Sequence, residues 1–144
     1  KQHGVIKNIT DREYLTNSHH VPVWEEVGIF EKLEIEAPFC KYPTGGCITY
    51  VELDSTFVKN TKAIKQIIEY AFDTLDIPYL AFNFPIDTCL ECGYTAEFNN
   101  ACPECGSTNI EQLRRVTGYL TTDYRKFNEG KRAETRERVK HSRY

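Results

Sequence analysis

The sequence predicts an α/β fold, because a strand, a helix and a second strand follow one another over about 40 residues. Residues 47–53 alternate in a strand pattern, residues 61–75 carry apolar side chains at helical spacing, and residues 77–84 form a second apolar run. Pro78 lies near the start of that run, where a missing N–H donor is tolerated. This order predicts a crossover unit with two parallel strands. Two pairs of cysteines follow within residues 89–105 and predict a small metal-binding lobe.

The helix at 61–75 is the most regular of these elements, and its start can be capped by Asn60 or Thr61. Its apolar residues recur at i, i+3, i+4, i+7, i+8 and i+11, so they form one stripe that we expect to be core: Ile64, Ile67, Ile68, Ala71, Phe72 and Leu75. In the strand at 47–53, both faces are expected to be covered. One face carries Cys47, Thr49, Val51 and Leu53, and the other carries Ile48 and Tyr50.

Residues 1–38 are predicted to be irregular with short elements. Residues 14–23 are typical of a loop or short extended segment, since Asn and Ser favour turns and Pro22 holds the residue before it away from the helical region. A short helix is expected over 24–33 and a turn at 44–46.

Length and composition exclude several classes of protein. A chain of 144 residues is expected to form one domain with at most a small appendage. Its 40% of apolar residues suffices for a packed core and excludes a disordered chain. No run approaches the ~18 apolar residues of a membrane helix, and the first residues carry no secretory signal, so a soluble, cytoplasmic protein is expected. An isoelectric point near 5.8 argues against a general nucleic-acid binder.

Charge is unevenly distributed along the chain. Residues 111–144 carry a net charge of +5, whereas residues 1–110 carry −8. Such asymmetry predicts a tail that docks on something negative, either the body of the same chain or a partner. Within the tail, Glu134 and Arg138 are spaced i, i+4 and are expected to form an ordinary ion pair on a helix surface.

The chain contains no methionine and begins at Lys1. A bulky residue in second position normally protects an initiator Met from removal, so we expect this chain to be a piece of a longer product. Removal of a leader or tag is the alternative.

Four cysteines form two C-x-x-C-G turns separated by nine residues: Cys89, Cys92, Cys102 and Cys105. Two residues between thiolates let both sulfurs of a tight turn point at one ion, and the following glycine can adopt positive φ. Two such turns bring four thiolates to a tetrahedral Zn²⁺. Because all four positions are filled by protein, the site is predicted to be structural and not catalytic.

Other interpretations of the quartet are a pair of disulfides, an iron centre in the same ligands, or a redox pair. Disulfides are disfavoured by the lack of a secretory signal. Cys40 and Cys47 lie outside the quartet and are expected to be small buried residues near the strand, with a redox role in a larger active site as the alternative.

Ten residues after Cys105 comes the hexapeptide RVTGYL at 115–120, in which Gly118 lies between Thr117 and Tyr119. Taken alone, such a glycine indicates a turn or bulge. The hexapeptide nevertheless resembles the radical loop of glycyl radical enzymes. With TNSHHVPV at 16–23, GGCITYVEL at 45–53, the cysteine quartet, FNEGK at 127–131 and RVKH at 138–141, essentially the whole chain resembles the C-terminal part of anaerobic (class III) ribonucleoside-triphosphate reductases.

The resemblance implies a radical stored on Gly118. Glycine suits this role, since its α-carbon can become planar between the amide nitrogen and the carbonyl without a side-chain clash. A separate activating enzyme with S-adenosylmethionine and an iron–sulfur cluster would remove the hydrogen atom. The radical would pass to a cysteine, whose thiyl abstracts the ribose 3′ hydrogen of a ribonucleoside triphosphate. The 2′ hydroxyl then leaves as water, and reduction, with formate in many members, yields the deoxyribonucleotide.

The resemblance also implies a domain plan. Residues 1–86 would be the C-terminal part of a ten-stranded α/β barrel, residues 87–110 an inserted four-cysteine zinc ribbon, and residues 111–144 the radical loop with its basic tail. The thiyl cysteine lies upstream in the family, so neither Cys40 nor Cys47 is assigned that role. The expected partners are the activating enzyme, which the tail is a candidate to contact, the nucleotide substrate, the remainder of the barrel and a second copy in a homodimer. No membrane or nucleic acid is expected.

Four polar residues of the TNSHH segment are candidates to line a substrate or phosphate pocket, with a structural loop as the alternative: Asn17, Ser18, His19 and His20. A metal site at the two histidines is not expected, because no third ligand lies at suitable spacing.

Two further pairs of charged residues draw attention. Glu52 and Asp54 flank the end of a predicted strand and are expected to be solvated. Arg114 and Arg115 either pair with acids that hold the radical loop or face water.

A rival interpretation from another functional class is a zinc-ribbon binding module whose basic tail contacts nucleic acid or an acidic partner. It predicts salt-sensitive binding and indifference to substitution of Gly118.

Overall fold

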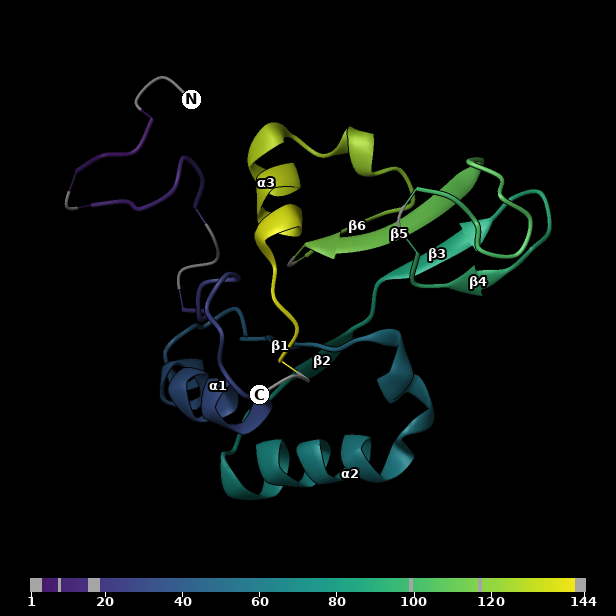
Figure 1. The fold of residues 1–144 in the computed structure, drawn as a ribbon. Coiled ribbons are helices and arrows are strands. Elements are labelled where there is room, and N and C mark those ends of the chain that lie inside the picture. The colour runs from purple at the N-terminus through teal and green to yellow at the C-terminus, as the bar shows by residue number, and fades with distance from the viewer. Residues whose placement is uncertain (1–3, 8, 16–18, 99, 117, 142–144) are drawn as a thin grey trace.

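A two-stranded and a four-stranded sheet, with helices beside them, make up the computed structural model, which describes residues 4–7, 9–15, 19–98, 100–116 and 118–141 (Figure 1). None of the helices in these ranges has the length and apolar character that crossing a membrane requires. In chain order the helices and strands are α1 (Ile29–Glu36), β1 (Thr49–Glu52), α2 (Thr61–Glu69), β2 (Leu80–Asn83), β3 (Ile86–Cys89), β4 (Thr95–Ala96), β5 (Ile110–Val116), β6 (Tyr119–Thr121) and α3 (Glu129–Glu137).

The predicted crossover unit is confirmed. Strands β1 and β2 pair in parallel, with Thr49 opposite Leu80 and Glu52 opposite Asn83, and α2 connects them. Asn60 caps α2, since its side-chain oxygen accepts a hydrogen bond from the backbone N–H of Ala63 at 3.1 Å.

The main core lies between α1, α2 and the parallel strand pair (Figure 1). Its buried members are Ile29, Leu33, Ala37, Val51, Leu53, Ile67, Ala71 and Ile77. Phe72, predicted to be core, is 44% exposed because α2 continues into a π-helical turn, Tyr70–Thr74, whose larger number of residues per turn shifts Phe72 off the core face, while Ala71 stays buried. Ile48, just before β1, is 43% exposed, whereas Tyr50 is half-buried against His20, so the second face is covered only in part.

The first helix lies later in the chain than predicted. It begins at Ile29, after Gly28 in an extended conformation, and not at residue 24. The reason is packing, because a helix that begins at Ile29 places Ile29 and Leu33 in the core and buries Glu36. The turn predicted at 44–46 is present, and the N–H of Gly46 donates to the carbonyl of Pro43 at 3.2 Å.

The four-stranded sheet is antiparallel, in the order β4–β3–β5–β6. Strand β3 pairs with β5 from Ile86 opposite Leu113 to Cys89 opposite Ile110. The sheet therefore joins the predicted zinc ribbon at 87–110 to the predicted radical loop at 111–144. Of the ten-stranded barrel implied by the resemblance, the described chain contains one parallel strand pair, so the barrel itself is not present in it.

The basic tail docks on the body of the same chain. Arg138, just after α3, forms ion pairs with Glu52 of β1 and with Glu134 at 3.0 Å. Lys140 pairs with Glu97, and the N–H of Val139 donates to the carbonyl of Val23 at 2.8 Å.

Two charged residues are buried where exposure was expected. Glu52 is 8% exposed and Glu134 is 1% exposed. The prediction of a solvated Glu52 was therefore wrong. The predicted Glu134–Arg138 ion pair is formed, but it is buried and does not lie on a helix surface. Both carboxylates bind Arg138, which follows α3, and this tertiary contact is not revealed by spacing along the chain.

His141, the last described residue of the tail, is hydrogen-bonded to β1. It is 3% exposed, and its Nδ1 accepts a hydrogen bond from the backbone N–H of Glu52 at 3.0 Å. Burial lowers the pKa of His141 to about 4. The ring is therefore neutral at neutral pH, and its protonation would remove this acceptor.

Acid should weaken the tail through His141. Because the folded pKa lies near 4 and the unfolded pKa near 6.5, the stabilisation is complete above pH 6.5 and is lost as the pH falls toward 4. We expect a loss of about 3 kcal/mol in the free energy of unfolding between pH 7 and pH 4. Urea denaturation at several pH values measures it. The variant His141→Gln should lack this part of the pH dependence, and an unchanged profile would contradict the assignment.

Candidate functional site

The two C-x-x-C-G turns fold into matching knuckles. In the first, the N–H of Gly93 donates to the carbonyl of Cys89 at 2.9 Å, and in the second the N–H of Gly106 donates to the carbonyl of Cys102 at 2.9 Å. Both glycines adopt positive φ, +75° and +73°. A side chain at either position would be strained, which explains the glycine that ends each motif.

The four cysteine sulfurs converge on one point. All four lie within 4.8 Å of one another, with Cys89–Cys105 at 3.5 Å and Cys92–Cys102 at 3.6 Å. Metal–sulfur bonds of about 2.3 Å in a tetrahedron place sulfurs about 3.8 Å apart. The donor set therefore fits Zn²⁺. Within the described ranges, no other group of three or more His, Cys, Asp or Glu side chains brings its ligand atoms this close together.

Backbone N–H groups favour the thiolate form of one member of the quartet, Cys89. The backbone N–H of Cys92 points at the sulfur of Cys89 and lowers the pKa of that thiol to about 7. Cys89 and Cys102 are buried, whereas Cys92 and Cys105 are exposed. The lobe is therefore held by backbone hydrogen bonds and by the four sulfurs.

Gly118 lies at the tip of the hairpin formed by β5 and β6, in which Val116 pairs with Tyr119. It is exposed, and a Cβ built on it has no heavy atom within 4 Å outside its chain neighbours. Thr117 lies outside the described residues. The space around Gly118 would accept a methyl group, so packing does not explain the glycine.

The stem of this hairpin is firmly anchored. Val116 is fully buried, and the carbonyl of Arg115 accepts hydrogen bonds from Arg138 Nη1 at 3.3 Å and Asn83 Nδ2 at 3.4 Å. Arg114 pairs with the buried Asp87 at 2.7 Å. Of the two alternatives, Arg114 therefore pairs with an acid beneath the loop.

Arg115 lies with its guanidinium 5.9 Å from the ring centre of Tyr50. The anchors on Asn83, Asp87 and Arg138 were missed by sequence reasoning. The residue pattern of β1 and β2 gave no sign of which strand would meet the loop.

The TNSHH segment is held by a buried carboxylate. Glu36 is fully buried, accepts the N–H of Val21 at 2.9 Å, contacts His20 Nδ1 at 3.2 Å and forms an ion pair with Lys32. Burial alone would raise the pKa of Glu36, but the hydrogen bonds from His20 and Lys32 outweigh it and lower that pKa to about 2. The candidate residues Asn17 and Ser18 lie outside the described ranges.

Cys40 and Cys47 are both buried, as expected, and lie beside His19. Their sulfurs are 2.8 Å apart, and the Cys47 sulfur is 3.0 Å from His19 Nε2. The structure thus brings together two cysteines and one histidine that no pattern in the sequence had linked.

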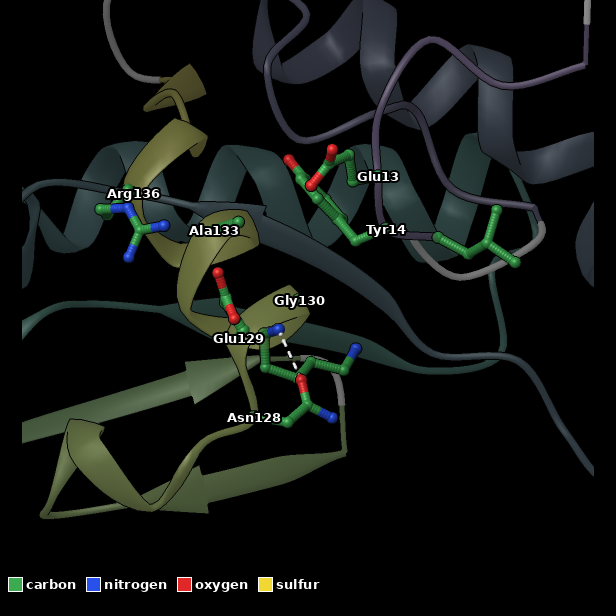
Figure 2. Close-up of a pocket in the computed structure, with 9 residues that line it drawn as sticks. Glu13, Tyr14, Asn128, Glu129, Gly130, Ala133 and Arg136 are labelled. Carbon is green, nitrogen blue, oxygen red and sulfur yellow. Dashed lines mark hydrogen bonds between the residues drawn. The ribbon is translucent and has the colours of Figure 1, made fainter. Parts of the chain in front are cut away.

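A cleft of about 560 Å³ lies where the N-terminal segment meets the start of α3, and the residues that line it are drawn in Figure 2. Asn128 caps this helix, and its Oδ1 accepts the N–H of Lys131 at 2.9 Å. The Tyr14 Cβ lies 3.2 Å from where a Cβ on Gly130 would be, so a larger residue would push the two segments apart. Carboxylates of Glu13 and Glu129 balance the cations around the cleft.

A parallel β–α–β unit, joined through an antiparallel sheet to a four-cysteine lobe, defines an α/β protein with a built-in metal-binding lobe. The family model for anaerobic ribonucleoside-triphosphate reductase matches residues 1–141. The chain therefore belongs to the anaerobic ribonucleoside-triphosphate reductase family.

Individual relatives agree with this assignment. The chain is 41% identical to the anaerobic ribonucleoside-triphosphate reductase of Haemophilus influenzae, with 98% of this chain and 21% of the relative covered. It is 40% identical to that of Escherichia coli (96% and 20% covered) and 39% identical to that of phage T4 (98% and 24% covered). A solved anaerobic ribonucleotide reductase superposes with a TM-score of 0.63 and 25% identity over 83% of this chain and 19% of the other. The chain thus spans about a fifth of the length of these relatives.

Loss of one knuckle cysteine should abolish metal binding and unfold the lobe. Structural zinc is worth about 10–16 kcal/mol in comparable sites, as much as the ~5–15 kcal/mol of a whole domain. In Cys92→Ser we expect zinc content to fall from about one ion per chain to nearly none. Hydrogen exchange should then reach unprotected rates over residues 89–109. Cys47→Ser, which alters a buried cysteine outside the quartet, is the matched control and should keep its zinc. Full metal content in Cys92→Ser would contradict the assignment.

Proposed function

We propose that this chain is the radical-storing region of an anaerobic ribonucleoside-triphosphate reductase, with the radical on Gly118 and a structural zinc ion on the four cysteines. The wider enzyme reduces ribonucleoside triphosphates to 2′-deoxyribonucleoside triphosphates. The thiyl cysteine that attacks the ribose lies outside this chain, in the remainder of the barrel.

The observation that carries the proposal is the open space around Gly118. A glycine is usually required by positive φ or by a close neighbour, as at Gly93 for φ and Gly130 for crowding. At Gly118 a methyl group meets no atom within 4 Å, so neither reason applies there. Gly45 is equally open, and it is the radical-loop hexapeptide around Gly118 that supports a chemical requirement for glycine at that position. A Cα radical is stabilised when the α-carbon is planar between the amide nitrogen and the carbonyl, and only glycine flattens without a side-chain clash.

The hairpin presents its glycine outward on a fixed stem. Tyr119 and Leu120 are 64% and 58% exposed, an apolar tip suited to burial inside the remaining barrel. The buried Val116 and the bonds to the Arg115 carbonyl hold the base of the hairpin in place. An activating enzyme that uses S-adenosylmethionine and an iron–sulfur cluster would reach Gly118 only when the tip is outside the barrel.

In this scheme zinc would cross-link the four-cysteine lobe and would take no part in the reaction, because four protein ligands leave no open coordination position. Cys89 would hold the ion at the end of β3, the strand that pairs with β5 and its hairpin. We place the enzyme in the cytoplasm and expect it to act as a homodimer.

The rival function, a ribbon with a basic tail that contacts nucleic acid, is disfavoured by how the tail is used. Arg138 pairs with Glu52 and Glu134, Lys131 pairs with Glu134, and Lys140 pairs with Glu97. These cations are neutralised within the chain and do not form a free basic surface for phosphates.

Gly118→Ala should abolish the radical without disturbing the fold. We expect the full-length enzyme, activated anaerobically with its activating enzyme and S-adenosylmethionine, to give a doublet in electron paramagnetic resonance from one α-hydrogen. The variant should give no signal, keep its zinc and change the free energy of unfolding by less than about 1 kcal/mol. In air, the activated wild-type chain should be cleaved at Gly118.

Gly45→Ala is the matched control, because a Cβ there also has no atom within 4 Å. It should keep the doublet. A doublet of normal size in Gly118→Ala, or none in a verified wild-type preparation, would contradict the proposal.

A further inference from the structure

We propose that Cys40 and Cys47 are a redox-active dithiol, which an oxidant of the peroxide class converts to a disulfide with His19 as the proton acceptor. The pair is separate from the zinc quartet and from Gly118, so the inference does not depend on the proposed function.

The two thiol groups lie almost close enough to form a disulfide bond. The sulfurs are 2.8 Å apart, whereas the sulfur pairs of the quartet are 3.5 and 3.6 Å apart. A disulfide bond is about 2.05 Å long, so the two sulfurs need to approach by less than about 1 Å. Cys40 lies in the short helical turn Ala37–Lys41 and Cys47 lies just before β1. The connection between them contains the turn at Gly45 and Gly46, a backbone that adjusts easily.

A metal site does not explain the pair. A tetrahedral ion needs three or four donors, and within the described ranges the quartet at Cys89–Cys105 is where such a group is found. Around Cys40 the further polar neighbours are the Thr49 hydroxyl at 3.8 Å and the Glu36 carbonyl at 3.6 Å, which are poor zinc ligands.

His19 supplies both a base and a route to solvent. Its Nε2 lies 3.0 Å from the Cys47 sulfur, and it lines an open cleft of about 420 Å³ together with His20, Pro22 and Phe39. Burial lowers the pKa of His19, so its imidazole is neutral and can accept a proton at neutral pH. Burial also raises the pKa of the Cys47 thiol to about 12, so a base in contact is needed to form the thiolate. A disulfide carries no charge and suits this buried position.

The reaction balances with one peroxide per pair. As the Cys47 sulfur attacks a peroxide oxygen, its proton moves to His19 Nε2, which acts as a general base. An S–O bond forms, the O–O bond breaks and the released hydroxide takes a proton to leave as water. The Cys40 sulfur then attacks the Cys47 sulfenic acid, and the second hydroxide leaves as water with the Cys40 proton. Two thiols lose two electrons and two protons, and hydrogen peroxide is reduced to two water molecules.

The test uses the full-length, zinc-loaded enzyme kept free of oxygen and treated with increasing hydrogen peroxide. Free thiols are alkylated, the protein is digested without reductant, and peptides are identified by mass spectrometry. We expect the peptides with Cys40 and Cys47 to become linked, with a mass about 2 Da below that of the two thiols, while the quartet still holds its zinc. Dithiothreitol should restore both alkylatable thiols. If both cysteines remain alkylatable after the quartet has lost its zinc, the proposal is wrong.

Two variants separate the steps. Cys40→Ser leaves the first step intact, so a sulfenic acid on Cys47 should be captured by a diketone probe. His19→Gln should slow disulfide formation by at least about a hundredfold, the lower end of the effect typical of a lost proton acceptor. An unchanged rate in His19→Gln would remove the histidine from the scheme. The measurement on the wild-type enzyme remains decisive even if a variant does not fold.

Discussion

The buried carboxylate of Glu52 ties the parts of this chain together. Its Oε2 accepts a hydrogen bond from Asn83 of β2 at 2.7 Å, its carboxylate pairs with Arg138, and its backbone N–H donates to His141. Arg138 in turn contacts Glu134 of α3 and the carbonyl of Arg115 beneath the glycine hairpin. Burial raises the pKa of Glu52 while Arg138 opposes that shift, so the carboxylate depends on its partner to stay charged. Removing one partner of such a pair typically costs about 3–5 kcal/mol.

These contacts join the crossover unit, the tail and the β5–β6 hairpin into one structure that carries Gly118. The crossover unit supplies an apolar core and a buried anion. The tail supplies the matching cation and closes over the hairpin stem. The tail therefore contributes to the fold mainly through charge, in agreement with the opposite signs of the two parts of the sequence.

Local signals in the sequence predicted much of this fold. The periodicity at 61–75, the Asn60 cap and the strand signal at 47–53 are properties of neighbouring residues. The structure contains the helix, its cap and the strand, and departs from the periodicity at Phe72. The cysteine spacing likewise identified a set of four converging sulfurs. The role of Gly118 rests on resemblance and on the open space around it, since one glycine in a sequence indicates only a turn.

Long-range contacts were not predictable in the same way. The pairing of β3 with β5, the burial of Glu52 and Glu134, and the approach of His19 to Cys47 join residues far apart in the chain. Periodicity and spacing describe one segment at a time and do not indicate which segments contact each other in the folded chain. The later start of α1 is similar, because the phase of a short helix is decided by the surface on which it packs.

The pairing of β3 with β5 has a mechanical consequence. A seven-residue antiparallel strand is about 24 Å long, so β5 acts as a lever arm with the cysteine lobe near one end and the glycine near the other. A rotation of about 10° about the lobe would carry the hairpin tip through about 4 Å, on the geometry of a rigid strand of that length. Stiffness in the cysteine lobe is thereby converted into positional accuracy at the glycine, which lies at the other end of the strand.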